Sequence, residues 1–280
     1  EDALMKLWQG LGYYSRARNL QKAARQIMEQ FGGVFPNTYE DIRSLAGVGD
    51  YTAGAIASIA FGIPVPAVDG NVLRVAARIT GDSGDITSPA MKKKVTAALQ
   101  AVIPAGEPGN FNQAMMELGA TVCLPNGAPQ CDKCPAAPFC RALVEDRIGE
   151  LPVKAPKKAR RMEERRVYLI FSDDGVALRR RPGKGLLAGL WEYPNELAGE
   201  ETIPDALGLS PADLELVGTG RHIFTHIEWR MTAYTARTEG LALPEGWVWA
   251  DREALAREYA VPNAFQAFSE YVKGKLGYFS

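Results

Sequence analysis

The sequence predicts two domains of different class, an all-α domain followed by an α+β domain. Up to about residue 145, apolar residues recur at helical spacing and no alternating strand pattern appears. A stretch rich in proline, lysine and arginine follows, and beyond it short apolar segments alternate with turn residues, as strands do. A chain of 280 residues is long enough for two domains that each bury their own core.

The all-α domain is expected to span residues 1–145. Its opening segment, "EDALMKLWQGLGYY", has the pattern of the middle of a helix and lacks the features of a secretion signal, so we expect the natural protein to start further upstream. After it, apolar residues recur at helical spacing in six segments separated by short turns. These segments lie at residues 17–31, 39–46, 51–61, 71–79, 91–103 and 111–123.

Residues 146–166 are expected to form a basic linker. The stretch holds Pro152 and Pro156, which precede the basic run from Lys157 to Arg161, and it contains little that could be buried. The run is predicted to be a solvated basic surface, with contact to DNA or to a partner protein as the alternative.

The second domain is expected to span residues 167–280. Residues 165–181 predict two strands joined across an Asp-Asp-Gly turn, and further strand patterns lie at 228–238 and 246–250. Between them, "SPADLELV" predicts a helix with Ser210 as its N-cap.

Composition predicts no membrane anchor, and it gives no overall evidence for nucleic-acid binding. No apolar run approaches the roughly 20 residues that a membrane span needs. The net charge of −1 gives no overall indication of a nucleic-acid partner, so such a partner has to be argued from individual segments.

The segment "LAGVGDYTAG" places Gly47, Val48 and Gly49 between two predicted helices. Glycine tolerates positive φ, so this turn can be tight and can leave its amide hydrogens pointing outward. Those amides and the N-terminus of the next helix would form a site for an anion such as a DNA phosphate, without base specificity. The alternative is a plain corner in which glycine caps the first helix.

Asp69 and Gly70 precede the predicted helix that starts near Asn71. The plain interpretation is that Asp69 only caps this helix or forms a turn. However, a negative charge is stabilised at a helix N-terminus, and an ionised carboxylate near a sugar can stabilise an oxocarbenium-like transition state. Asp69 is therefore a candidate catalytic residue.

The four cysteines, Cys123, Cys131, Cys134 and Cys140, all fall within one short segment. Disulfides are disfavoured because nothing else in the sequence indicates an oxidising compartment. A structural zinc site is possible, although zinc ribbons usually pair two Cys-x-x-Cys motifs and only one is present here. The spacing also suits four thiolates around one iron–sulfur cluster.

The two histidines, His222 and His226, are four residues apart, which would suit a metal pair on a helix. The sequence around them is typical of a strand, where this spacing does not bring the two side chains together in the same way. No metal pair is expected from them.

Taken together, the motifs resemble those of the helix-hairpin-helix DNA glycosylases that carry an iron–sulfur cluster. The resemblance rests on "LAGVGDYTAG", on "VDGNVLRV" and on "FNQAMMELGATVC", which leads into the cysteines. The segment "LWQGLGYYSRARNL" and the second domain narrow it to the adenine DNA glycosylase (MutY) family, over nearly the whole chain. It implies a [4Fe-4S] cluster on the four cysteines and a nudix-like fold for the second domain. One departure is that seven residues separate Cys123 from Cys131, where the family usually has six.

The resemblance also implies an activity. Members of this family remove adenine mispaired with 8-oxoguanine or guanine from double-stranded DNA, so such a duplex is the expected partner. We expect a monomer in the bacterial cytoplasm, associated with the nucleoid.

Several site residues carry over from the resemblance. Asp69 is expected to stabilise the sugar cation after adenine leaves, and Asn71 to order that site. Tyr13 matches the side chain that wedges into the base stack beside 8-oxoguanine, and Arg16 in the same segment is expected to contact DNA. Tyr51 stands where endonuclease III-like relatives carry a Schiff-base lysine, so a monofunctional glycosylase is expected.

In the second domain, Phe224, Thr225 and His226 stand where the family has a Phe-Ser-His loop that touches 8-oxoguanine. Threonine keeps the hydroxyl of serine and adds a methyl group. The glutamate-rich box with which nudix hydrolases hold magnesium is missing after "GLLAGLWEYP". Recognition of the oxidised base without hydrolysis is therefore expected.

The resemblance places the catalytic glutamate, which protonates adenine, upstream of "LWQGLGYY" and outside these residues. The chain alone is therefore expected to bind DNA weakly and to excise nothing. Two alternatives stay open: an endonuclease III-like glycosylase and lyase, against which Tyr51 and the second domain argue, and a DNA-binding protein without catalytic activity.

Overall fold

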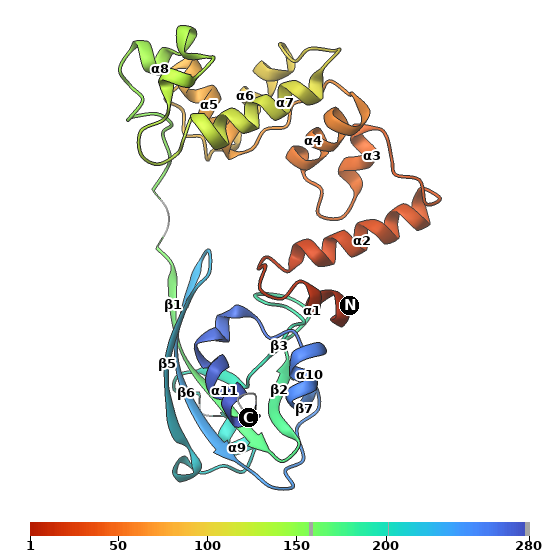
Figure 1. Ribbon diagram of the computed structural model, residues 1–280, viewed down its shortest axis with the longest axis vertical. Helices are drawn as coiled ribbons and strands as arrows, with labels where there is room; N and C mark the ends of the chain where they lie inside the picture. Colours follow the sequence, from red (N-terminus) through yellow and green to blue (C-terminus); the bar gives the residue numbers. More distant parts are fainter. Residues whose placement is uncertain (157–158, 201, 278–280) are drawn as a thin grey trace. The chain divides into compact units, whose positions relative to one another are not determined.

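The structure is a computed structural model that describes residues 1–156, 159–200 and 202–277 (Figure 1). It divides into two compact units, which are described separately below. Residues 19–157 form a helical unit, whereas residues 1–18 join residues 158–280 in a sheet-containing unit. The predicted all-α and α+β classes are confirmed, but the sequence pattern did not predict that the first residues pack with the sheet.

The regular structure of the helical unit consists of α-helices and short helical turns. Helix α2 (Ser15–Gln30) leads into this unit. The remaining elements are α3 (Tyr39–Ser44), α4 (Asp50–Phe61), α5 (Gly70–Thr80), α6 (Pro89–Gln100), α7 (Pro108–Glu117), a π-helical turn (Leu118–Val122), two 3-10 turns (Cys131–Lys133 and Ala137–Phe139) and α8 (Arg141–Val144).

Local sequence explains where several of these helices begin and end. The side chains of Thr38, Asp69 and Ser88 each accept a hydrogen bond from the backbone amide three residues further on, at the starts of α3, α5 and α6. Helices α4 and α5 end at Gly62 and Gly81, which have left-handed φ angles of 66° and 68°.

The main core of the helical unit lies around α5. Val72 and Leu73 of α5 are buried together with Met91 and Val95 of α6. Burial of this apolar face is the main force that holds the helix in place. It also fixes the start of α5, and with it Asp69.

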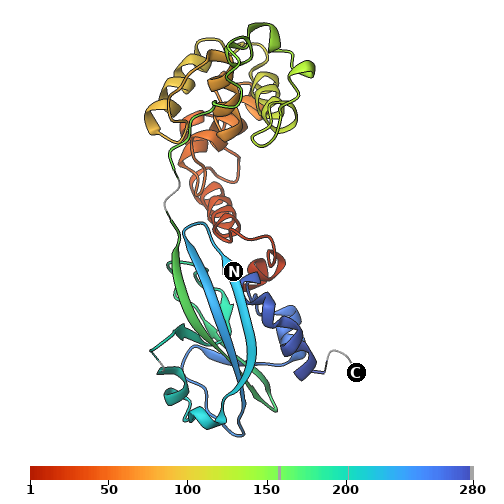
Figure 2. The same ribbon diagram turned by 90° about the vertical axis from the view of Figure 1, so that its left-hand side faces the viewer.

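The sheet-containing unit is built on a seven-stranded sheet over the described residues. Its strands are β1 (Arg161–Ser172), β2 (Gly175–Arg180), β3 (Trp191–Glu192), β4 (Asn195–Leu197), β5 (Glu215–Ile223), β6 (Ile227–Arg237) and β7 (Trp247–Ala250). The order is β3-β2-β1-β6-β5, with β4 paired to β1 and β7 paired to β2. Strands β1 and β6 are parallel, and Figure 2 shows the long strands β1, β6 and β5 side by side.

The alternation of side chains along β1 gives the sheet two cores, because successive residues of a strand point to opposite faces. Leu169 packs on one face with Phe265 and Phe268, which precede helix α11 (Ser269–Lys275). Ile170 packs on the other face with Ile203 of α9 (Thr202–Ala206). Helices thus cover both faces of the sheet.

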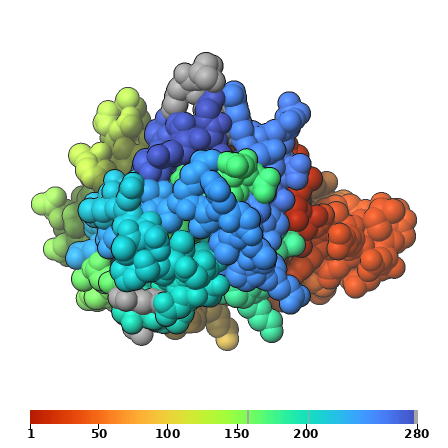
Figure 3. Space-filling view, turned by 90° about the horizontal axis from the view of Figure 1, so that it is seen from below, coloured from red at the N-terminus to blue at the C-terminus, as the bar shows by residue number. Residues whose placement is uncertain are grey.

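Helix α1 (Asp2–Leu7) packs on this unit as well. Met5 is 2% exposed and lies in one buried cluster with Leu190, which precedes β3, and with Ala260, which follows α10 (Arg252–Arg257). In Figure 3 the red atoms of the N-terminal residues lie beside blue atoms of the C-terminal segment.

The helix predicted for "SPADLELV" is wrong beyond its first turn. Ser210 does cap a turn, but only Pro211–Asp213 are helical, in a 3-10 turn, and β5 starts at Glu215. Leu216 pairs with Tyr234 of β6, so ladder hydrogen bonds and sheet packing outweigh the local helical preference.

The strand pair predicted across the Asp-Asp-Gly turn is confirmed as β1 and β2. Strand β1 already begins at Arg161, within the stretch expected to be a linker. The prediction of a solvated basic surface falls partly on Lys157 and Lys158, which lie outside the described residues. None of the helices in the described part of the chain is long and apolar enough to cross a membrane.

Candidate functional site

The turn between α3 and α4 is short and exposed. Helix α3 ends at Ser44, two residues earlier than the sequence predicted, and a hydrogen bond from the Val48 amide to the Leu45 carbonyl (3.0 Å) closes the turn. Gly49 is the N-cap of α4 and provides no side-chain cap. The first amides of α4 are therefore available for an external anion.

The two glycines of this turn have different roles. Gly47 has a φ of 78°, and a Cβ built on it would lie 2.5 Å from the Cβ of Asn19 in α2. Gly47 is therefore required both by its backbone conformation and by the close approach of α2. Gly49 has an ordinary φ of −93° and no neighbour within 4 Å of its built Cβ.

Asp50, the first residue of α4, puts a negative charge at this turn. Its carboxylate accepts a hydrogen bond from Arg43 Nε and lies 3.7 Å from Lys92 Nζ. The hydrogen bond from Arg43 lowers the pKa of Asp50, which therefore stays ionised. Two cationic side chains thus flank the turn and offset the charge of Asp50.

Asp69 is the N-cap of α5, and both of its carboxylate oxygens are held. Oδ1 accepts a hydrogen bond from the Val72 amide (2.8 Å), and Oδ2 accepts one from Asn71 Nδ2 (3.0 Å). The helix N-terminus stabilises the negative charge. The predicted capping role of Asp69 is confirmed, and Asn71 orients the second oxygen.

Tyr51 lies in the first turn of α4 and shares an environment with Asp69. Its hydroxyl donates to Met116 Sδ at 3.2 Å. Burial raises the pKa of Tyr51, and the negative charge of Asp69 raises it further. Tyr51 and Asp69, two predicted site residues, are therefore close enough for their charges to interact. Tyr51 is protonated at neutral pH.

Arg74, which was not among the predicted site residues, connects this site to the cysteine segment. The side chain is 4% exposed. It donates to Asn71 Oδ1 (3.0 Å), to the Gly119 carbonyl in the π-helical turn (2.6 Å) and to the Cys123 carbonyl (2.8 Å). The available signal was the pair of arginines, Arg74 and Arg78, four residues apart within the mostly apolar segment "NVLRVAARI".

The four cysteines line one small void, together with apolar side chains of α5 and of the π-helical turn. Burial raises the pKa of the Cys131 thiol, and the neighbouring thiols of Cys123, Cys134 and Cys140 raise it further. Arg78, also on α5, donates to Cys123 Sγ at 3.2 Å. Among the residues that the structure describes, no three His, Cys, Asp or Glu side chains are grouped for a single metal ion.

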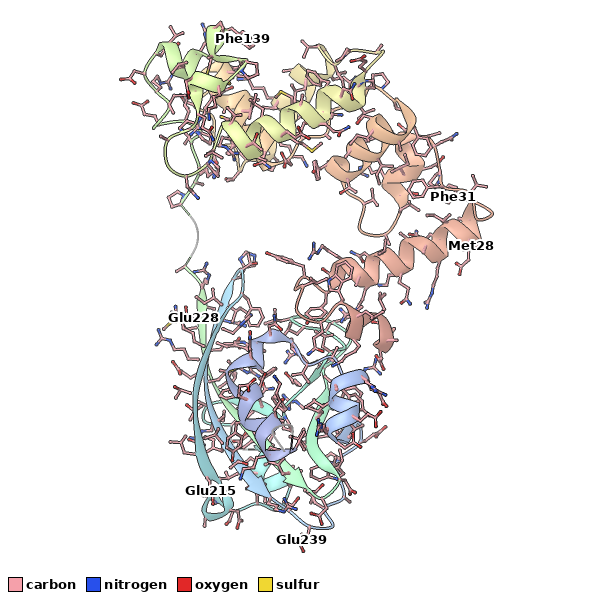
Figure 4. All side chains as sticks on the ribbon, viewed as in Figure 1. Met28, Phe31, Phe139, Glu215, Glu228 and Glu239 are labelled. Atoms are coloured by element: carbon pink, nitrogen blue, oxygen red, sulfur yellow. The ribbon has the colours of Figure 1, made fainter. Side chains whose placement is uncertain are left out.

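These residues fit an iron–sulfur cluster in the chemistry of their donors. Four cysteines line one void together with apolar side chains, and Arg78 donates a hydrogen bond to the sulfur of Cys123. Both features are typical of protein sites for such clusters. Phe139 lies on the 3-10 turn between Cys134 and Cys140, and its side chain is exposed (Figure 4).

The sheet-containing unit has a pocket of about 590 Å³. Its walls come from the loop after α1, the loop before β3, the β5–β6 turn and the segment before α11. The lining residues are Gly10–Ser15, Arg18, Gly185–Ala188, His222–Ile227 and Pro262–Ala264. The structure thus brings Tyr13 to the same pocket as Phe224, Thr225 and His226.

Tyr13 is presented by a constrained loop. It has a φ of 47°, which is uncommon for a residue with a side chain, and 73% of its surface is exposed. The guanidinium of Arg16 lies 5.8 Å from the Tyr13 ring centroid and donates to the Leu11 carbonyl. Arg16 therefore supports the loop from within, in addition to the DNA contact predicted for it.

His222 lies on β5 and lines the pocket, whereas His226 lies in the turn that follows. The His222 ring packs edge-to-face on Phe224 (4.5 Å between centroids), which in turn packs on Trp229 (4.9 Å). Burial lowers the pKa of His222. The spacing of His222 and His226 in the sequence suggested only a metal pair, which was not expected, and no pattern predicted the place of His222 in this pocket.

Two family models match the chain. Residues 1–104 match the HhH-GPD superfamily of base excision DNA repair proteins, and residues 166–271 match the NUDIX domain. The first match includes residues 1–18, which pack in the sheet-containing unit of the structure.

Curated relatives match along most of the chain. The adenine DNA glycosylase of Rattus norvegicus is 34% identical, over 98% of this chain and 65% of that protein. The adenine DNA glycosylase of Homo sapiens is 36% identical, over 90% of this chain and 57% of that protein. A solved structure of a thermostable thymine-DNA glycosylase is 30% identical, over 51% of this chain and 65% of that one, with a TM-score of 0.45.

These relatives are longer proteins, of which this chain spans at most about two thirds. The two family models and the curated relatives nevertheless agree with the two confirmed fold classes and with the resemblance to the adenine DNA glycosylases. The chain combines a region of the HhH-GPD superfamily with a NUDIX domain and is a homologue of the adenine DNA glycosylases (MutY).

Proposed function

We propose that this chain belongs to a base-excision repair enzyme that removes adenine mispaired with 8-oxoguanine or guanine from duplex DNA. The observation that carries the proposal is the Asp69 carboxylate, held by Val72 and Asn71 at the start of α5 in a homologue of adenine DNA glycosylases. The exposed amides of the hairpin at Gly49 would bind a backbone phosphate without base specificity.

In the proposed reaction, the bond between the deoxyribose C1′ and adenine N9 breaks, and its electron pair leaves with the base. A general acid protonates the adenine, and the resemblance assigns this role to a glutamate outside these residues. Asp69 stabilises the positive charge that develops on the sugar, and water then completes the hydrolysis. The enzyme would be monofunctional, because Tyr51 has no amine with which to form a Schiff base.

We further propose that Cys123, Cys131, Cys134 and Cys140 hold a [4Fe-4S] cluster. Such a cluster would cross-link the cysteine segment through four metal–thiolate bonds. The shared apolar void and the Arg78 donor support this assignment. Metal analysis of anaerobically purified protein should give about four iron atoms per chain, whereas one zinc and no iron would contradict it.

The decisive experiment is a single-turnover assay on a duplex with adenine opposite 8-oxoguanine. The 280-residue chain should be compared with a version extended at its N-terminus by the corresponding segment of a curated adenine DNA glycosylase. We expect both to bind the duplex and only the extended version to release adenine. Size-exclusion chromatography of the same samples tests the expected monomer.

Other outcomes identify the alternatives. Adenine release by the short chain would mean that a general acid lies within these residues and that the roles above are wrong. Trapping of a DNA adduct with borohydride would favour an endonuclease III-like lyase. Binding without excision by the extended version would favour a DNA-binding protein that has no catalytic activity.

A further inference from the structure

The segment that presents Tyr13 is packed onto the C-terminal sheet. Met5 and Tyr14, on either side of the loop after α1, are 2% and 6% exposed. They form one buried cluster with Leu190 and Ala260. The apolar contacts therefore fix both ends of the loop to the same unit that carries the pocket.

Two polar side chains of this segment bind backbone carbonyls near α10. The Lys6 ammonium donates to the carbonyls of Leu255 (2.8 Å) and Tyr259 (3.1 Å), and to Gln9 Oε1 (2.7 Å). Gln9 Nε2 donates to the Val261 carbonyl at 2.7 Å. Lys6 thus uses all three of its donors, and its burial is reflected in a lowered pKa.

The loop between these anchors has an uncommon conformation. Gly10, Gly12 and Tyr13 all have positive φ angles, of 93°, 64° and 47°. Asn263 Nδ2 donates to the Gly10 carbonyl (3.3 Å), and Trp8 Nε1 donates to the Gly12 carbonyl (3.1 Å). A backbone of this kind persists only where surrounding contacts impose it, so the anchors determine where the Tyr13 ring points.

We infer that Lys6 and Gln9 are positioning residues for recognition of the oxidised base. They tie α1 to the backbone between Leu255 and Val261 and so hold Tyr13 at the pocket formed with residues 222–227. Recognition of the oxidised base then depends on a fixed separation between the Tyr13 loop and residues 222–227, because a small displacement of a binding group lowers the affinity. This inference rests on the proposed function.

The test compares the affinity of the 280-residue chain for duplexes with adenine opposite 8-oxoguanine and opposite guanine. We expect Lys6→Met to lower the ratio of the two affinities about fivefold or more. Lys6→Arg, which keeps the charge and the donors, should retain most of the ratio. In a Tyr13→Ala background, Lys6→Met should have no further effect, because Lys6 acts through Tyr13.

Lys273→Met is the matched control, since Lys273 lies in the same unit but only pairs with Glu270 on the surface. It should leave the ratio unchanged. If Lys6→Met unfolds the unit, Gln9→Leu takes its place and is measured in the wild-type and Tyr13→Ala backgrounds. An unchanged ratio in folded Lys6→Met or Gln9→Leu, while Tyr13→Ala lowers it, would overturn the inference and leave the proposed function intact. A wild-type chain that binds both duplexes equally would also overturn the inference, because no recognition of the oxidised base would remain to be positioned. A wild-type chain that binds neither duplex would instead contradict the proposed function.

Discussion

At the scale of single residues, the proposed chemistry depends on the charge of Asp69 rather than on its hydrogen bonds. Asparagine caps helices as well as aspartate does, so Asp69→Asn should preserve the fold and DNA binding. It removes the negative charge opposite the developing sugar cation. In the extended version we therefore expect the single-turnover rate of adenine release to fall about 100-fold or more.

Asp251→Asn provides the matched control. Asp251 caps α10 with the same geometry, accepting a hydrogen bond from the Ala254 amide at 2.8 Å, but it lies in the other unit. Both variants should stay folded, with a somewhat larger stability cost at Asp69, where asparagine loses the oxygen that accepts from Asn71. Only Asp69→Asn should slow excision. Equal rates for both variants would remove Asp69 from the mechanism.

His222 gives the pocket a dependence on pH. Burial lowers its pKa below the usual value near 6.5, so the folded state favours the neutral imidazole. The unfolded chain then binds the proton more readily. Above pH 6.5 His222 is neutral in both states and does not reduce the free energy of unfolding. As the pH falls from there through the folded pKa, proton binding to the unfolded chain lowers the free energy of unfolding.

His222→Gln should therefore reduce the loss of stability between neutral and mildly acidic pH, measured by urea unfolding followed by tryptophan fluorescence. His226→Gln is the comparison, because His226 is exposed in the turn next to the same pocket. A pH dependence that is the same in wild type and in His222→Gln would contradict this account.

At the scale of elements, the hairpin between α3 and α4 contains two glycines with different requirements. Gly47→Ala introduces a side chain at positive φ and forces its Cβ into Asn19, which should cost roughly 2–4 kcal/mol of stability. Gly49→Ala meets open space at an ordinary φ, and the cost at a helix N-cap should stay below about 1 kcal/mol. Thermal unfolding followed by far-UV circular dichroism measures both. Equal destabilisation by the two substitutions would show that the turn has another conformation.

Elements with a strong local signal were predicted well from the sequence. Asp69 followed by an amphipathic segment predicted the start of α5, and the Asp-Asp-Gly turn predicted the pair of β1 and β2. In both cases residues close in the chain supply the cap or the turn, so propensity and periodicity are sufficient. The cysteine spacing similarly predicted one compact loop around a single site, and all four cysteines line one void, whereas the cluster itself stays a prediction.

Elements that depend on distant contacts were missed or wrongly predicted. Strand β5 exists because it pairs with β6, although "LELV" follows a helical turn. Arg74 is buried because Gly119 and Cys123 offer it carbonyl groups from about 45 residues away. A single sequence does not contain these partners in any local pattern, so only the assembled fold identifies them.

At the scale of the whole molecule, the division into two units separates two parts of the proposed function. The hairpin, Asp69 and the cysteines lie in residues 19–157, whereas Tyr13 and the pocket with His222 lie in the sheet-containing unit. The first unit would hold the sugar, and the second would examine the opposite base. Tyr13 belongs to the second unit although residues 1–104 match the HhH-GPD superfamily, so the boundary in the structure differs from the boundary in the sequence.

This division can be tested because all five tryptophans lie in the sheet-containing unit. They are Trp8, Trp191, Trp229, Trp247 and Trp249. Tryptophan fluorescence therefore follows the unfolding of that unit, while far-UV circular dichroism is dominated by the helices of the other unit. Two-domain proteins need such separate probes, since a single unfolding midpoint is not defined for them.

Met5→Ala should lower the unfolding free energy of the sheet-containing unit by roughly 2–4 kcal/mol, because it opens a cavity beside Leu190 and Ala260. The fluorescence transition should shift to lower urea, and the helical transition should not. Met28→Ala is the matched control, since Met28 is 67% exposed at the end of α2 (Figure 4) and its truncation should shift neither transition. A shift of the helical transition alone in Met5→Ala would mean that α1 is part of the helical unit. The Tyr13 loop would then move with the hairpin and Asp69, and the positioning role of Lys6 would lose its structural basis.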